Sequence, residues 1–117
     1  MLMVMAALAG ILGVALSAAA AHSSSGPNLD TASRFLLLHA PVLLAIVALA
    51  AGGLVHVPIA RAAGWVMVLG LVLFCGDLAS RAYRGAGLFP MAAPSGGFAL
   101  MGGWALLGLA ALIRVFR

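Results

Sequence analysis

Hydrophobic residues dominate the chain in four long runs, separated by short segments rich in polar residues, glycine and proline. A membrane-spanning helix needs about 20 mostly apolar residues, and each run reaches that length. The runs predict transmembrane helices over approximately residues 2–21, 32–55, 62–83 and 95–113. Because the connections are short, we expect one all-α domain over residues 1–117, a four-helix transmembrane bundle with short loops.

The first run resembles a cleavable signal peptide at its end, where Ala19 and Ala21 form a small-residue pattern that signal peptidase reads. A signal peptide also needs a positively charged start and a shorter apolar core of about 7–15 residues. No Lys or Arg precedes this run, and the run is long enough to span a bilayer. We therefore expect a retained transmembrane helix, with His22 at a membrane surface directly after it.

The connections carry the residues that begin and end helices. The polar segment after His22 favours a turn, and we expect Asp30 or Thr31 to cap the second helix. Two glycines and Pro58 favour a break between the second and third helices.

Composition agrees with a membrane protein. Hydrophobic residues make up 66% of the chain, which has only six basic and two acidic residues, whereas ordinary soluble domains are less than half apolar. The arginines are spread singly along the chain and form no basic patch, so we expect no nucleic-acid partner. The heavy use of Ala, Gly, Val, Leu and Arg is consistent with a GC-rich bacterial genome.

The distribution of arginines bears on orientation. An even number of crossings places both termini on one side, and the two sides carry equal numbers of arginines: Arg61, Arg114 and Arg117 against Arg34, Arg81 and Arg84. Arg34 and Arg81 lie within predicted helices, and discounting them favours cytoplasmic termini by the positive-inside rule. We expect a multi-pass protein of the bacterial inner membrane with both termini in the cytoplasm.

Small residues are expected to hold the helices together, because they allow close backbone approach in lipid. Trp104 falls near the middle of the fourth predicted helix, so its indole N–H needs an acceptor inside the bundle. The residues to which we assign a helix-packing role are Gly10, Gly13, Gly70, Gly96, Gly97, Gly103 and Trp104.

Ionisable residues gather toward one predicted surface. Asp77 and Arg81 are four residues apart on one helix and share a face. His39 follows the start of its helix by about seven residues and Asp77 precedes the end of its own by about as many, so both lie roughly 10 Å below the same surface at 1.5 Å per residue. The sequence predicts one polar cluster: His22, Arg34, His39, Asp77 and Arg81.

The cluster has a structural and a functional interpretation. The groups can neutralise one another and fix helix register, or they can form a proton, quinone or ion site. A haem held by His22 and His39 is a further alternative, although His22 lies close to the surface. We expect no catalytic, cofactor or metal site, because no recognisable arrangement of nucleophile and base or of metal ligands occurs.

Four segments resemble a known family: "ALSAAAAHSS", "LLLHAPVLL", "LFCGDLAS" and "APSGGFALMGGW". Their order and spacing are similar to those of the small membrane proteins of domain-of-unknown-function family 423, whose eukaryotic relatives are called transmembrane protein 256. The resemblance covers nearly the whole chain and implies a four-helix fold in a membrane. It implies no activity.

Two functions remain open from the sequence. The first is a structural or accessory subunit that packs against other subunits of a larger membrane complex, such as a respiratory or photosynthetic one. The second is a small oligomeric transporter or channel that uses the His/Asp/Arg cluster. A transporter needs a polar path to both surfaces, whereas the polar residues here gather at one end. The sequence therefore favours the accessory subunit, without enzymatic activity and with the lipid bilayer and other membrane proteins as partners.

Overall fold

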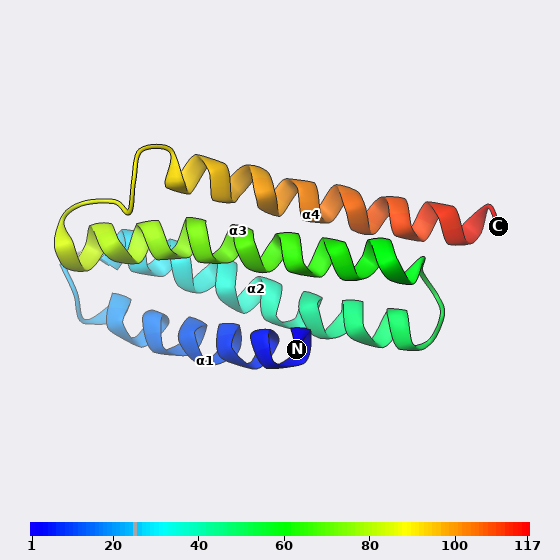
Figure 1. Ribbon diagram of the computed structural model, residues 1–117. Helices are drawn as coiled ribbons and strands as arrows, with labels where there is room; N and C mark the ends of the chain where they lie inside the picture. Colours follow the sequence, from blue (N-terminus) through cyan, green and yellow to red (C-terminus); the bar gives the residue numbers. More distant parts are fainter. Residues whose placement is uncertain (25) are drawn as a thin grey trace.

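The computed structural model describes residues 1–24 and 26–117 and contains four α-helices in these residues (Figure 1). They are α1 (Leu2–Ala21), α2 (Gly26–Ala51), α3 (Val57–Arg84) and α4 (Ala92–Val115). Each is long and apolar enough to cross a membrane. The expected all-α fold of four transmembrane helices is confirmed.

Three helices begin earlier in the chain than the hydrophobic runs predict. The predicted starts at residues 32, 62 and 95 become Gly26, Val57 and Ala92, and in each case a proline lies in the first turn. Proline is tolerated there because the first N–H groups of a helix have no intrahelical acceptor. The prolines therefore mark helix starts, although Pro27 and Pro58 lie in segments where the sequence interpretation placed a turn and a helix break.

The expected cap of α2 by Asp30 or Thr31 is wrong, because both residues lie inside the helix. The Thr31 hydroxyl donates a hydrogen bond of 3.0 Å to the carbonyl of Pro27, one turn back. At its other end α2 stops at Ala51, before the predicted residue 55. Gly53 ends the helix there with a positive φ of 67°, a conformation that glycine adopts without steric cost.

The helices form an open stack in which α2 and α3 are central (Figure 1). α1 packs on α2, α2 on α3 and α3 on α4, and α1 meets α3 over a small area only. Within the described residues, α1 and α4 do not pack against each other. Both termini and the α2–α3 turn lie toward one end, hereafter the terminal end, and the other two connections lie at the far end (Figure 1).

The core lies where α2 and α3 meet their neighbours. Leu43 and Ile46 of α2 and Met67 of α3 are completely buried. Cys75 is buried with them, and its thiol lies 3.5 Å from the carbonyl of Ala32 on α2. This apolar interior fixes how α2 and α3 face each other, and hence where their polar residues lie.

Four of the glycines assigned to packing lie at close helix contacts. A Cβ on Gly70 would lie 2.8 Å from the carbonyl oxygen of Gly96, and one on Gly96 would lie 2.5 Å from the backbone nitrogen of Phe74. Gly103 lies against Met67, and Gly13 allows α1 to approach Leu37 of α2. These glycines set the α3–α4 and α1–α2 separations.

Gly10 and Gly97 do not have the expected role within the chain, because a Cβ on either would meet nothing within 4 Å. The reason is the open stack. α1 and α4 are edge helices, so only part of each packs closely on a neighbour. Gly10 and Gly97 are half-buried, and Gly97 borders the hollow between α2 and α4.

Candidate functional site

The most completely bonded ionisable residue is Asp77, near the far end of α3. Its side chain is fully buried, and its Oδ2 accepts a hydrogen bond of 2.8 Å from Nε of Arg81, whose side chain is half exposed. Its Oδ1 accepts a bond of 2.8 Å from the backbone N–H of Leu88, in the connection to α4. The expected contact between Asp77 and Arg81 is therefore present.

The connection after α3 is shaped around this carboxylate. The hydroxyl of Ser80 donates a bond of 2.7 Å to the carbonyl of Ala86. Gly87 passes so close to Asp77 and Arg81 that a Cβ there would collide with both side chains. Ser80 was missed by the sequence interpretation, although its position three residues after Asp77 places both on one helix face.

His39, buried on α2, forms a second polar site with a different partner. Its Nδ1 lies 2.8 Å from the carbonyl oxygen of Phe35, and its Nε2 accepts a bond of 3.2 Å from the indole N–H of Trp104 on α4. Because Nε2 accepts, the neutral ring carries its proton on Nδ1 and donates it to Phe35. This pair supplies the acceptor that Trp104 was expected to need.

Aromatic rings surround the histidine. The ring of Phe35 is stacked on His39 with centroids 6.1 Å apart, and Trp104 meets His39 edge-on at 6.0 Å. Phe74 of α3 lies 4.5 Å from Phe35, between centroids. A hollow of about 380 Å³ opens beside these rings, between α2 and α4. Both ring nitrogens of His39 are engaged, so the site fixes the position of α4 and leaves no free base.

The remaining members of the expected cluster lie apart from these two sites. Arg34 pairs with Asp30 one turn earlier on α2, with 2.9 Å between Nε and Oδ2, and both side chains are exposed. His22 follows the end of α1 and is exposed. The single cluster is thus divided among separate partners, because the helices turn His39 toward α4 and Arg34 outward.

The divided arrangement bears on the ligand-binding alternatives. Within residues 1–24 and 26–117, no three His, Cys, Asp or Glu side chains come together as a metal-binding group. His22 and His39 have different surroundings, one exposed and one buried and hydrogen-bonded to Trp104. The haem and metal alternatives therefore gain no support from the geometry.

A family profile described as "Protein of unknown function (DUF423)" matches residues 15–97. The chain belongs to this family. The match covers α2 and α3 completely and includes the end of α1 and the first residues of α4. It contains the whole Asp77 site and His39, whereas Trp104 and Gly103 lie beyond it. The family description assigns no activity.

No curated protein and no solved structure matches the chain.

Proposed function

We propose that this small membrane protein is an accessory subunit of a larger complex in a bacterial inner membrane, without enzymatic activity of its own. The observation that carries the proposal is the open space at three glycines on the edge helices. A Cβ added to Gly10 of α1, or to Gly97 or Gly108 of α4, would meet no atom within 4 Å. Small residues at a lipid-facing surface allow another helix to approach closely.

The buried polar groups support a structural role over transport. The buried polar side chains of the described residues are Ser33, His39, Asp77 and Ser80. Asp77 and Ser80 hold the α3–α4 connection and His39 holds Trp104. Toward the terminal end the interior is filled by Leu43, Ile46 and Met67, which favours a closed core over a polar path between the two surfaces.

The arginines support an orientation with both termini in the cytoplasm. Arg34 and Arg81 are paired with Asp30 and Asp77, respectively, at the far end. Their charges are thereby offset, which leaves Arg84 at that end against three arginines toward the terminal end. The positive-inside rule places the more basic side in the cytoplasm.

The proposal is tested by native gel electrophoresis of membranes solubilised in a mild detergent. The tagged wild-type chain is expected to migrate with a larger assembly, and Gly10→Leu is expected to move it to the position of the free chain. Ala15→Leu is the control, because Ala15 is a small, exposed residue of the same helix, whereas Gly10 is half-buried. Folding of Gly10→Leu is expected to be unchanged, since a Cβ at this position would meet no atom within 4 Å.

Migration of the wild-type chain only in its free form, together with unchanged membrane complexes after its deletion, would overturn the accessory role. Equal loss of the assembly in both variants would show that the partner does not use the open glycine.

A further inference from the structure

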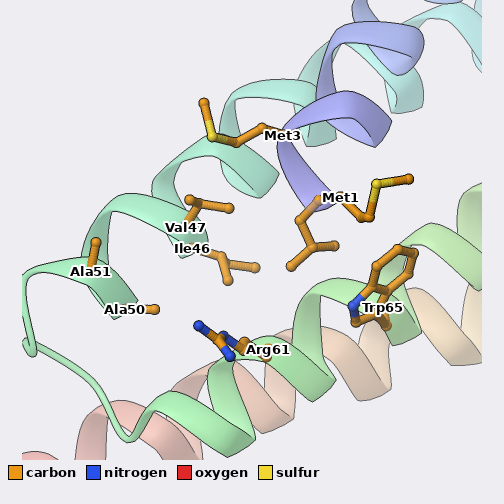
Figure 2. A pocket seen from close by; sticks show the side chains of 9 residues that line it. Met1, Met3, Ile46, Val47, Ala50, Ala51, Arg61 and Trp65 are labelled. Atoms are coloured by element: carbon orange, nitrogen blue, oxygen red, sulfur yellow. The ribbon is translucent and has the colours of Figure 1, made fainter.

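Two hollows follow one another along the side of the molecule where α1 and α3 both rest on α2. The first, called here the Arg61 hollow, has a volume of about 370 Å³ and lies toward the terminal end (Figure 2). Its lining includes Met1, Leu2, Ile46, Ala50, Arg61 and Trp65. The second, called the α1–α3 groove, has a volume of about 400 Å³ and is lined by apolar residues that include Met5, Leu12, Leu43, Val68, Val72 and Cys75.

The two hollows are consecutive along the same pair of helices. Leu2 lines the first and Met5 the second, one turn apart on α1, as Trp65 and Val68 are on α3. α1 and α3 touch where the side chain of Leu2 lies against Gly64, and both residues are buried. The two hollows, which lie one turn apart along the same pair of helices, are hereafter together called the channel.

Arg61 brings an unpartnered positive charge to one end of this channel. Figure 2 shows its side chain reaching from α3 toward the end of α2 near Ala50. The carbonyls of Ala48 and Ala50 there already accept bonds from the N–H groups of Gly52 and Gly53. No hydrogen bond or ion pair engages Arg61 among the described residues.

No acidic side chain of the protein lies at this end. Its only two acidic residues are Asp30 and Asp77, and both are paired with arginines at the far end. Trp65 beside Arg61 is 45% exposed, and its indole N–H is a second donor at the same opening. The opening therefore complements an anionic oxygen-rich group from outside the chain.

The length of the apolar part fits one lipid leaflet. The hydrocarbon core of a bilayer is about 30 Å thick, so one leaflet accounts for about 15 Å, or roughly ten residues of helix. Counting ten residues along α3 from Trp65 leads to Cys75, which lines the deeper part of the α1–α3 groove. An acyl chain whose headgroup lies at Trp65 would thus follow the groove to about the bilayer midplane.

From the unpartnered cation, the adjoining donor and the leaflet-length apolar groove, we propose that this channel binds one anionic phospholipid. The phosphate accepts hydrogen bonds from the Arg61 guanidinium and from the Trp65 indole N–H. An acyl chain lies between α1 and α3 over α2. Arginine suits this task because its planar fork of N–H groups matches phosphate oxygens. The site is independent of the proposed accessory role, since it needs no protein partner.

The probe is phosphatidylglycerol, compared with phosphatidylcholine of the same acyl chains, added to the full chain in mild detergent. Native mass spectrometry counts the lipids bound to each chain. The wild type is expected to retain one phosphatidylglycerol in preference to phosphatidylcholine. Arg61→Gln is expected to weaken phosphatidylglycerol binding about tenfold, the size of one lost charge-assisted hydrogen bond. It is expected to weaken phosphatidylcholine binding less, because the choline cation of that lipid offsets the charge of its phosphate.

Arg117→Gln is the matched control, because Arg117 is an exposed arginine toward the same end that does not line either hollow of the channel. It is expected to keep the wild-type preference, and Arg61→Lys to keep part of it. Val72→Trp places a large side chain at the rim of the groove, where Val72 is 61% exposed. It is expected to reduce retention of both lipids.

Equal losses in Arg61→Gln and Arg117→Gln would overturn the site in favour of diffuse attraction by surface charge. Equal retention of the two lipids by the wild type, or a lipid-free dimer with the groove covered by a second copy, would overturn it too. Retention unchanged in Val72→Trp would show that the acyl chain lies elsewhere.

Discussion

Asp77 fastens the connection between α3 and α4 to the end of α3. One carboxylate oxygen holds Arg81 on the same helix and the other holds the backbone of Leu88, eleven residues further along the chain. Ser80 adds a bond to Ala86 in the same connection. A buried carboxylate with two donors of this kind is costly to leave unpaired, so the pair specifies one path for the chain into α4.

The Asp77–Arg81 pair is expected to respond unequally to its two single substitutions. Arg81→Gln leaves a buried carboxylate without its cation and is expected to destabilise the protein by about 1–3 kcal/mol. Asp77→Asn is expected to cost less, because its amide oxygen still accepts from Leu88 and Arg81 reaches solvent. The double variant is expected to be more stable than Arg81→Gln alone, as measured by thermal unfolding in detergent.

Asp30 and Arg34 provide the matched control, since they have the same four-residue spacing but are both exposed. Asp30→Asn and Arg34→Gln are expected to change stability by less than about 1 kcal/mol. Strictly additive losses at Asp77 and Arg81, or losses equal to those of the exposed pair, would contradict the interpretation that burial makes Asp77 dependent on its partner.

Residue contacts within one helix were predictable, and contacts between helices were not. The spacing of Asp77 and Arg81 places them on one face whatever the fold, so their ion pair follows from the sequence. His39 and Trp104 are 65 residues apart, and their pairing depends on how α2 and α4 both lie on α3. Equal depth in the membrane suggested a cluster of His39 with Asp77, but depth does not say toward which neighbour a helix face points.

At the scale of elements, the α3–α4 contact depends on backbone approaching backbone. Gly70 and Gly96 bring the two helices together so closely that each glycine lies near a backbone atom of the other helix. Backbone atoms cannot swing aside as the tip of a flexible side chain can. The crossing point is therefore the least tolerant position of the stack, whereas neighbouring positions on the edge helix α4 face open space.

Gly96 and Gly97 offer a direct comparison of two adjacent glycines. Gly96→Ala is expected to destabilise the protein by about 1–3 kcal/mol, or more if the helices must separate to admit the methyl group, because its Cβ would lie 2.5 Å from the nitrogen of Phe74. Gly97→Ala is expected to be neutral or to stabilise by up to about 1 kcal/mol through helix propensity. Thermal unfolding of the isolated chain measures both, and equal effects would contradict the α3–α4 contact described here.

The hydrophobic runs predicted the number and type of elements, but the periodicity did not predict their faces. In lipid both the inner and the outer face of a helix are apolar, so small residues carry the only packing signal. That signal identified Gly13, Gly70, Gly96 and Gly103 correctly, but also Gly10 and Gly97, which meet nothing in the chain. The two groups of glycines differ only in whether a neighbouring helix of the stack lies close against them, which the sequence does not show.

At the scale of the whole molecule, polarity is divided between the two ends. The far end holds both acidic residues, each paired with an arginine. The terminal end holds Arg61, which has no acidic residue beside it, and the hollow that it lines. The far end thus keeps one arginine, Arg84, without an acidic partner, against three arginines toward the terminal end, and this asymmetry supports the proposed orientation.

The orientation is tested by labelling single introduced cysteines from one side of the membrane. Ser24→Cys lies in the α1–α2 connection at the far end, and Arg117→Cys lies at the terminal end; both positions are exposed. In intact cells, a membrane-impermeant thiol reagent is expected to label Ser24→Cys and to leave Arg117→Cys unlabelled until the membrane is permeabilised. The wild type is the background control, because its one cysteine, Cys75, is buried. Labelling of Arg117→Cys alone would show the opposite orientation and contradict the argument from the arginines without acidic partners. Labelling of both variants from outside would contradict an even number of membrane crossings.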